Sequence, residues 1–126
     1  MVRYLYNRQM SPPAPFVHVA CRCPETGKEV TGIPAQLDTA ADRTVLPWHV
    51  IDALALAVVR EISLEGVGGK VTRIPTFLLD LELRHQRPLA IEAAALREEP
   101  FILLVRDVLN QFRILFDGPN LAFEIE

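Results

Sequence analysis

Short segments typical of β-strands follow one another through most of the chain, and turn-forming residues separate them. Residues 16–22 (FVHVACR) are rich in β-branched and aromatic side chains. Residues 33–38 (IPAQLD) predict the returning strand after a turn in which Gly27 and Gly32 can adopt positive φ. Further strands are predicted at residues 44–47, at 88–96, at 101–105, at 113–116, at 121–126 and, as a pair, within 58–83. This succession, which has no internal repeat, predicts a mainly β domain of barrel or sandwich type.

Two short helices are predicted between these strands. The first covers residues 47–56 and places Trp48, Ile51 and Leu54 on one face. The second covers residues 106–112, with its apolar side chains at Val108, Leu109 and Phe112.

The chain of 126 residues has the length of one ordinary domain, and 50% hydrophobic residues are enough for a core without disulfides. Three prolines within residues 1–15 indicate an N-terminal arm rather than a regular element, so residues 16–126 are predicted to form the single domain. Cys21 and Cys23 would point to the same face of a strand. They are predicted to be reduced thiols and not half of a metal site, because no second Cys/His pair stands at ligand spacing.

Charge and hydropathy argue against several classes of partner. The net charge is −3, and Lys and Arg are scattered, which argues against nucleic acid. No apolar run approaches a membrane span, and the first residues do not resemble a signal peptide, so we expect a cytoplasmic protein without a membrane partner. The chain also lacks a G-x-S-x-G elbow, a phosphate loop and clustered histidines, and neither a metal nor another cofactor is expected.

Three of the six glycines fall within residues 66–69, between the two strands predicted inside 58–83. Glycine loses more conformational entropy on folding than other residues, so such a cluster indicates a backbone that must bend or approach another chain closely. A plain hairpin turn would need only one or two glycines. The cluster therefore favours a hairpin tip that acts as a mobile flap.

Asp38 lies in the segment AQLDTAADRTVLP (35–47), surrounded by small and apolar residues. A carboxylate in such surroundings is costly unless it is paired or hydrogen-bonded. One solution is a second carboxylate that shares a proton with the first, which lets one acid take a proton from water while the other gives one to a carbonyl oxygen. The simpler alternative is a turn aspartate that caps its own loop.

Four segments in the expected order resemble the retropepsins, the retroviral-type aspartic proteases, and together they span about residues 14–126. LDTAADRTVLP resembles the active-site loop L-D-T-G-A-D-x-T-V-L, and EGVGGKV (65–71) resembles the flap tip G-I-G-G. FILLVRDVLNQF (101–112) resembles the segment of two hydrophobic residues, Gly, Arg, Asn or Asp and an apolar helix. RILFDGPNLAFEI resembles the closing strands.

The resemblance implies a closed β-barrel with one short C-terminal helix and a flap hairpin. It implies a homodimer in which each chain supplies one loop: the two Asp38 residues would form the catalytic pair, and Thr39 would hydrogen-bond across the interface. The expected activity is that of an aspartic endopeptidase, with a peptide bound as an extended strand. The substrate-binding residues that the resemblance implies are Ala40, Ala41, Asp42, Gly66, Val67, Gly68 and Gly69. Arg106 would pair with Asp42, and the segment 121–126 would help to form the dimer sheet, with Leu121, Phe123 and Ile125 on one face.

Two positions depart from the family pattern at the site itself. Ala40 stands where the family has the Gly of D-T-G, and Val105, a supporting residue beside Arg106, stands where the family has Gly. An alanine at a positive φ would strain the loop, whereas an alanine at a negative φ would cost little. The departures favour one alternative, a dimeric peptide-binding module with little or no catalysis. A third alternative, a monomeric β-domain used only for interaction, also stays open.

Overall fold

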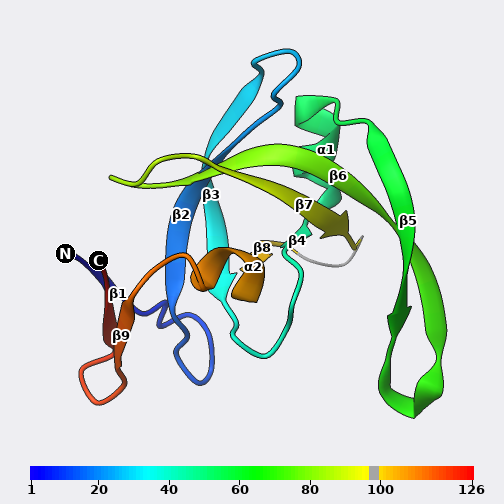
Figure 1. The fold of residues 1–126 in the computed structure, drawn as a ribbon. Helices are drawn as coiled ribbons and strands as arrows, with labels where there is room; N and C mark the ends of the chain where they lie inside the picture. The colour runs from blue at the N-terminus through cyan, green and yellow to red at the C-terminus, as the bar shows by residue number, and fades with distance from the viewer. Residues whose placement is uncertain (97–99) are drawn as a thin grey trace.

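The strands of the chain form a closed barrel (Figure 1). The computed structural model describes residues 1–96 and 100–126, and Val67 by its backbone only. In spatial order the barrel strands are β2 (Phe16–Arg22), β3 (Glu29–Leu37), β8 (Ile102–Leu104), β4 (Val45–Leu46), β7 (Leu89–Ala95) and β6 (Val71–Leu83). Antiparallel pairing of β2 with β6, in which Val19 lies opposite Leu83, closes the ring. The predicted mainly β barrel is confirmed.

The long strand β6 shows why these residues form a barrel. Phe77, Leu79 and Leu81 are buried and alternate with Leu78, which is exposed, and Asp80, which is half-buried. Since successive side chains of a strand point to opposite faces, this period of two gives the strand one apolar face. The core consists of such faces from all the barrel strands together with the apolar sides of the helices.

Strand β3 begins four residues earlier than predicted, at Glu29, because the turn after β2 is tighter than the sequence suggested. Gly27 and Gly32 both have positive φ, at 76° and 67°, as expected. The register between β2 and β3 shifts between Val19 and Cys21, opposite Gly32, so this glycine accommodates a bulge inside the strand.

The helices are shorter than predicted. Helix α1 (Trp48–Leu54) ends at Leu54, because the next residue, Ala55, has a left-handed backbone with φ of 51°. Its buried residues are Val50, Ile51 and Leu54, whereas Trp48 is half-buried and meets the ring of Phe77 edge-on at 6.0 Å. Helix α2 (Arg106–Leu109) gives way to tighter turns, because the N–H groups of Gln111 and Phe112 bond to the carbonyls three residues before them.

A second sheet joins the two ends of the described chain. Its order is β1 (Val2–Leu5), β10 (Ala122–Ile125) and β9 (Ile114–Asp117), with both pairs antiparallel. The prediction that residues 1–15 contain no regular element is therefore wrong for β1. Local composition could not reveal this strand, because its partner lies more than a hundred residues away and the stacking of Tyr4 on Phe123 at 5.0 Å is equally remote.

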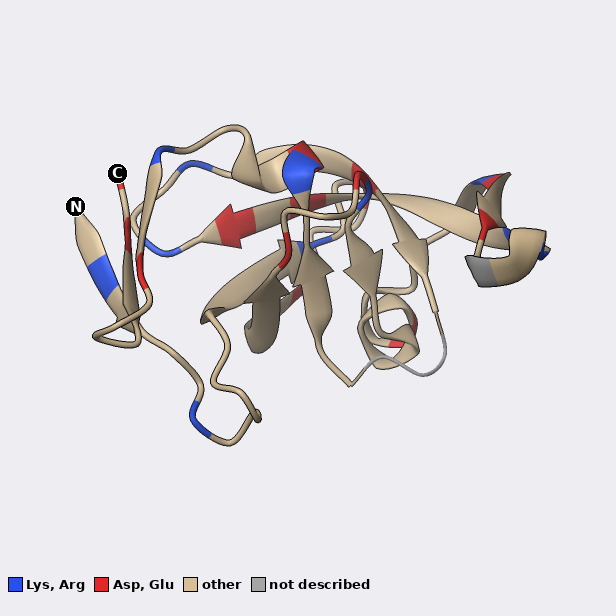
Figure 2. Ribbon diagram, turned by 90° about the horizontal axis from the view of Figure 1, so that it is seen from below, with Lys and Arg blue, Asp and Glu red and all other residues tan. Residues whose placement is uncertain are grey.

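Strand β5 (Val58–Glu65) pairs with the first half of β6 and forms a hairpin that projects from the barrel (Figure 1). A short 3-10 turn, Val67–Gly69, makes the tip. We call this element the glycine-tipped hairpin. Figure 2 shows that its tip and the terminal sheet lie at opposite ends of the molecule, and that basic and acidic segments are interspersed along the ribbon.

Neither helix of the described ranges has the length and hydropathy that a bilayer-spanning helix requires.

Candidate active site

The candidate catalytic loop, residues 38–44, leaves the barrel where β3 pairs with β8. Leu37 is buried, and the N–H of Asp38 donates to the carbonyl of Leu104 over 2.9 Å, which fixes the start of the loop to the barrel. The Asp38 carboxylate is half-buried and accepts the N–H of Ala40 at 2.9 Å. Thr39 and Ala40 are exposed at the tip of the loop. One chain thus presents a single carboxylate on a loop that its own backbone holds in place.

Ala40 adopts a backbone conformation that suits alanine. The non-glycine residues with positive φ in the described ranges are Ala55, His85 and Leu121, and Ala40 is not among them. Its methyl group therefore adds no left-handed strain to the loop. Within a single chain, alanine in place of the family glycine therefore causes no backbone strain in the D-T-A loop.

Val105 is accommodated as well. It is fully buried, with φ of −121° and ψ of −163°, a region open to β-branched residues. Its carbonyl accepts the N–H of Leu109 at 2.8 Å and so begins helix α2. The side chain that replaces the family glycine is part of the core in this chain.

Arg106 supports the loop in a different way from the one expected. Its Nε donates to the carbonyl of Ala41 over 2.9 Å, and its backbone N–H reaches the same oxygen at 3.3 Å. Among the ion pairs formed by residues 1–96 and 100–126, none joins Arg106 to Asp42, whose side chain is exposed. The expected ion pair is replaced by a charged hydrogen bond to the backbone one residue earlier, which leaves the Asp42 carboxylate facing solvent.

Asp107 anchors the far end of the loop and was not singled out from the sequence. Its carboxylate accepts the hydroxyl of Thr44 at 2.7 Å and the backbone N–H of Thr44 at 2.9 Å. Thr44 is fully buried, so both of its donors depend on this carboxylate. One feature of the sequence could have predicted the contact between Asp107 and Thr44. Asp107 directly follows the matched Arg106, at a position where the family pattern has Asn or Asp.

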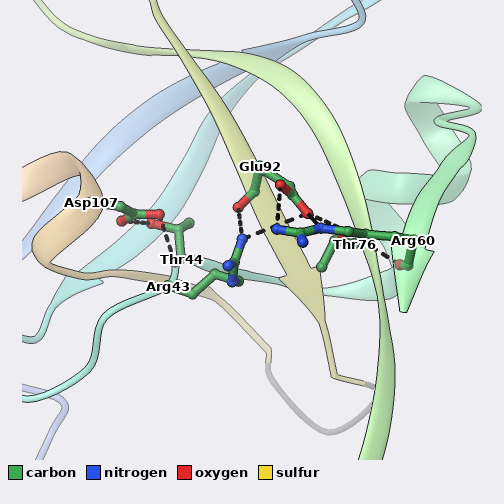
Figure 3. A network of polar contacts seen from close by, with 6 residues as sticks. All are labelled: Arg43, Thr44, Arg60, Thr76, Glu92 and Asp107. Atoms are coloured by element: carbon green, nitrogen blue, oxygen red, sulfur yellow. Dashed lines mark hydrogen bonds and ion pairs between the residues drawn. The ribbon is translucent and has the colours of Figure 1, made fainter. Parts of the chain in front are cut away.

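Glu92 on β7 forms a second anchor that sequence reasoning missed (Figure 3). Its carboxylate accepts two hydrogen bonds from Arg60 of β5, at 2.7 and 3.1 Å, and one from the buried hydroxyl of Thr76, at 2.7 Å. Arg43 of the catalytic loop donates to the Glu92 carbonyl at 3.2 Å and lies 3.7 Å from its carboxylate. One acidic side chain thus connects the loop to the base of the glycine-tipped hairpin.

The charged neighbours change the acidity of this group. Hydrogen bonds from Arg60 and from Thr76 lower the pKa of Glu92 from 4.5 to about 2. The same contact with Glu92 raises the pKa of Arg60. The Glu92 carboxylate that connects loop and hairpin therefore stays ionised until the pH falls towards 2.

The tip of the hairpin carries the expected glycines. Gly68 and Gly69 have φ of 84° and 75°, and Gly66 N–H donates to the carbonyl of Lys70 at 2.9 Å. The prediction of a hairpin tip is confirmed, while its role as a flap stays a prediction. The side chain of Val67, an expected substrate contact, lies outside the described part. A cavity of about 360 Å³ lies beside the tip, lined by Leu64, Glu65, Gly66, Lys70, Thr72, Ile74 and Leu96.

A larger cavity of about 1050 Å³ lies between residues 4–10 and the beginning of β2, and it reaches Phe101 before β8. Its described lining includes Tyr4, Arg8 and Phe16 but neither Asp38 nor Thr39. Phe16 meets Phe101 edge-on at 5.0 Å, so the cavity has an aromatic wall close to the strand that anchors the catalytic loop.

A six-stranded barrel with one D-T-x loop, a glycine-tipped hairpin and a short helix after β8 has the architecture of retropepsin-like aspartic proteases, and comparison with solved structures shows this fold. A retropepsin-like aspartic protease from Rickettsia conorii superimposes with a TM-score of 0.67 at 14% identity, over 98% of this chain and 88% of that one. EIAV protease in complex with the inhibitor HBY-793 superimposes with a TM-score of 0.56 at 22% identity, over 86% of this chain and 93% of that one. No family model and no curated protein matches the sequence. The chain therefore has the retropepsin-like fold.

Proposed function

We propose that this protein is a homodimeric aspartic endopeptidase whose catalytic pair consists of Asp38 from each of two chains. The observation that carries the proposal is the Asp38 loop. It starts from a barrel strand, exposes its D-T-A tip and bears no positive φ at Ala40, within a retropepsin-like fold. A single chain supplies one such carboxylate, so the site is complete only in a dimer.

The chemistry follows from two carboxylates that share one proton. The ionised Asp38 takes a proton from a water molecule held between the two side chains, and the water oxygen attacks the carbonyl carbon of the peptide bond. The protonated Asp38 gives its proton to the carbonyl oxygen. When the resulting intermediate collapses, the C–N bond breaks and the amine leaves with a proton returned by a carboxyl group. The glycine-tipped hairpin would close over the extended peptide and exclude bulk water.

The proposal is tested by cleavage of a mixed peptide library at mildly acidic pH, with products identified by mass spectrometry. Asp38→Asn should lower kcat/KM by at least about 10²- to 10⁴-fold, because the variant can no longer take the proton from water. Asp52→Asn is the matched control, since Asp52 is an exposed carboxylate on α1 and its loss should leave cleavage unchanged. Full activity of Asp38→Asn would refute the proposal.

A second candidate function is a dimeric peptide-binding module that does not cleave what it binds. The replacement of both family glycines, by Ala40 and Val105, is the observation in its favour. The double variant Ala40→Gly, Val105→Gly separates the two candidates. A large gain of proteolysis would support the binding module, whereas efficient cleavage by the natural sequence excludes it.

A further inference from the structure

Glu92 receives its partners from three separate parts of the chain, and one oxygen atom is common to all of them (Figure 3). Its Oε2 accepts the Nε–H of Arg60 and the hydroxyl of Thr76, both at 2.7 Å, and lies 3.7 Å from Nη1 of Arg43. Arg43 belongs to the catalytic loop, Arg60 to β5 and Thr76 to β6. Because the partners share this atom, a displacement of one arginine changes the position of the acceptor for the other. We call these four residues the Glu92 cluster.

The two arginines of the cluster depend on the same acid. Within residues 1–96 and 100–126, the ion pairs of Arg43 and of Arg60 are both made with Glu92. The Glu92 side chain is 22% exposed, whereas the pair between Arg73 and Glu61 on the same hairpin has side chains that are 70% and 56% exposed. Since solvent weakens exposed ion pairs most, the Glu92 cluster is the stronger of the two connections.

The cluster lies where the glycine-tipped hairpin leaves the barrel. Thr76 is the last residue of β6, towards the tip, that pairs with β7, and residues 71–75 pair with β5 alone. Arg60 lies opposite Thr76 on β5, and its carbonyl accepts the Thr76 hydroxyl at 3.2 Å. The tip lies about seven residues beyond this point, so it stands about 20 Å away at roughly 3.3 Å per residue. Over that length a tilt of about 5° at the cluster moves the tip by about 2 Å.

The same cluster lies at the anchored end of the catalytic loop. The carbonyl of Thr44, the residue next to Arg43, accepts the N–H of Ala94 at 2.9 Å. Ala94 lies opposite Thr76 in the ladder between β6 and β7, two residues after Glu92. The end of the loop and the base of the hairpin therefore meet on β7, and the Glu92 side chain contacts both.

We infer that Glu92 is a positioning residue, which makes the positions of the catalytic loop and of the glycine-tipped hairpin depend on each other. Closure of the hairpin over a peptide displaces Arg60 and with it the carboxylate, so the contact with Arg43 changes and the loop that bears Asp38 adjusts. Conversely, the position of the loop sets the angle at which the hairpin leaves the barrel. The inference deepens the proposed function and rests on it for the effect on cleavage, but the coupling belongs to the folded chain and can be measured without a substrate.

Hydrogen exchange of the full chain tests the coupling directly. Arg60→Gln removes the hairpin side of the cluster, at a residue that lies outside the loop. It should nevertheless speed exchange at the N–H groups of Thr44 and Arg106, which bond to the Asp107 carboxylate and to the Ala41 carbonyl. We expect a rise of about 3- to 10-fold relative to the amides of β2, which report global unfolding.

Arg43→Gln makes the reverse test. It should speed exchange in residues 60–64 of the hairpin by a similar factor, although Arg43 itself lies in the loop. Arg73→Gln is the matched control, because it breaks the solvent-exposed pair with Glu61 on the same hairpin and should leave exchange in the loop unchanged. Exchange that rises only in the element that carries the substitution would overturn the coupling.

The kinetics of peptide cleavage distinguish a positioning role from a merely structural one. Because the pKa of Glu92 is about 2, its carboxylate is ionised at the mildly acidic pH of the cleavage assay. Arg43→Gln and Arg60→Gln should each lower kcat/KM about 3- to 10-fold, and Arg60→Gln should lower kcat itself although it changes the hairpin. The double variant should lose no more than the worse single variant, since either change already disconnects the two elements. Losses that multiply, or a loss at Arg60→Gln confined to KM, would overturn the inference.

The outcomes separate this inference from the proposed function. Coupled exchange in a chain that cleaves no peptide would support the role of Glu92 and refute the endopeptidase. Efficient cleavage together with independent exchange of the loop and the hairpin would refute the coupling and leave the endopeptidase standing.

Discussion

The catalytic loop and the tip of the glycine-tipped hairpin are both exposed turns beside the candidate site, yet they are held very differently. The loop 38–44 is attached to the barrel by bonds that span many residues of sequence, from Leu104, Arg106, Asp107 and Glu92. The hydrogen bonds found at the tip stay within the tip, between Gly66, Gly69 and Lys70. A catalytic loop must keep its reacting group in a fixed geometry, whereas a flap must be able to move over the substrate. The many long-range bonds of the loop suit the first role, and the local bonds of the tip suit the second.

The largest effect is expected from loss of the Asp107 anchor. Asp107→Ala leaves the hydroxyl and the N–H of the buried Thr44 without their acceptor, at a cost of about 1–3 kcal/mol for each unsatisfied group. We expect a lower midpoint of thermal unfolding together with a strong loss of kcat/KM. Asp107→Asn keeps an acceptor oxygen and should recover part of both. If Asp107→Ala unfolded like the natural chain, the loop would not depend on this anchor.

The next effect concerns Glu92 and has a defined pH range. Its pKa is lower in the folded protein, at about 2, than the ordinary 4.5, so its contribution to stability is complete above about pH 4.5 and is lost as the pH falls towards 2. Glu92→Gln should reduce stability at neutral pH and flatten the change between these two values. Urea unfolding at several pH values measures this. Glu61→Gln removes an exposed carboxylate of the same hairpin and is the control, since its pair with Arg73 lies in solvent.

A smaller effect is expected from changes at the hairpin tip. A Cβ at Gly68 would meet no atom within 4 Å, so Gly68→Ala acts through its φ of 84° alone, at a cost of roughly 1–2 kcal/mol. Because this strain is paid in the folded state, the unfolding midpoint should fall by a few degrees, and kcat/KM should drop because the tip is displaced. Gly66 has a φ of −96°, and Gly66→Ala should be mild. Equal effects at the two positions would show that backbone conformation at the tip is not what matters.

The smallest effect is expected at Ala40. Since its φ is not positive, Ala40→Gly should lower stability by at most about 1 kcal/mol, through the greater freedom of the unfolded chain, and should leave kcat/KM within a few-fold. A rise of more than tenfold in proteolysis would instead show that the alanine restrains catalysis. To decide between these outcomes, kcat/KM is measured for the natural chain and the variant with one peptide substrate, and the unfolding curves of both proteins are compared.

Sequence reasoning succeeded where the signal was local. The strand-like segments, the glycines of the hairpin tip and the D-T-A loop all lie within short windows, and the fold class could be predicted from them. It failed where a structure depends on a remote partner. The prolines after residue 10 suggested an arm, because nothing near β1 indicates that Val2 pairs with Ile125.

The polar anchors of the site show the same limit. Arg43, Arg60 and Glu92 come from separate segments, and each one alone resembles an ordinary solvated charge. Only the barrel brings them within hydrogen-bonding distance. The expected pair between Arg106 and Asp42 failed for a finer reason: a shift of one residue in the acceptor, from the Asp42 carboxylate to the Ala41 carbonyl, cannot be predicted from spacing.

The pairing of β1 with β10 also sets the order in which the molecule can be completed during translation. Residues 16–104 contain all the barrel strands and can close the barrel while synthesis continues, but residues 2–5 have no partner until residues 122–125 have left the ribosome. The terminal sheet therefore forms after the barrel.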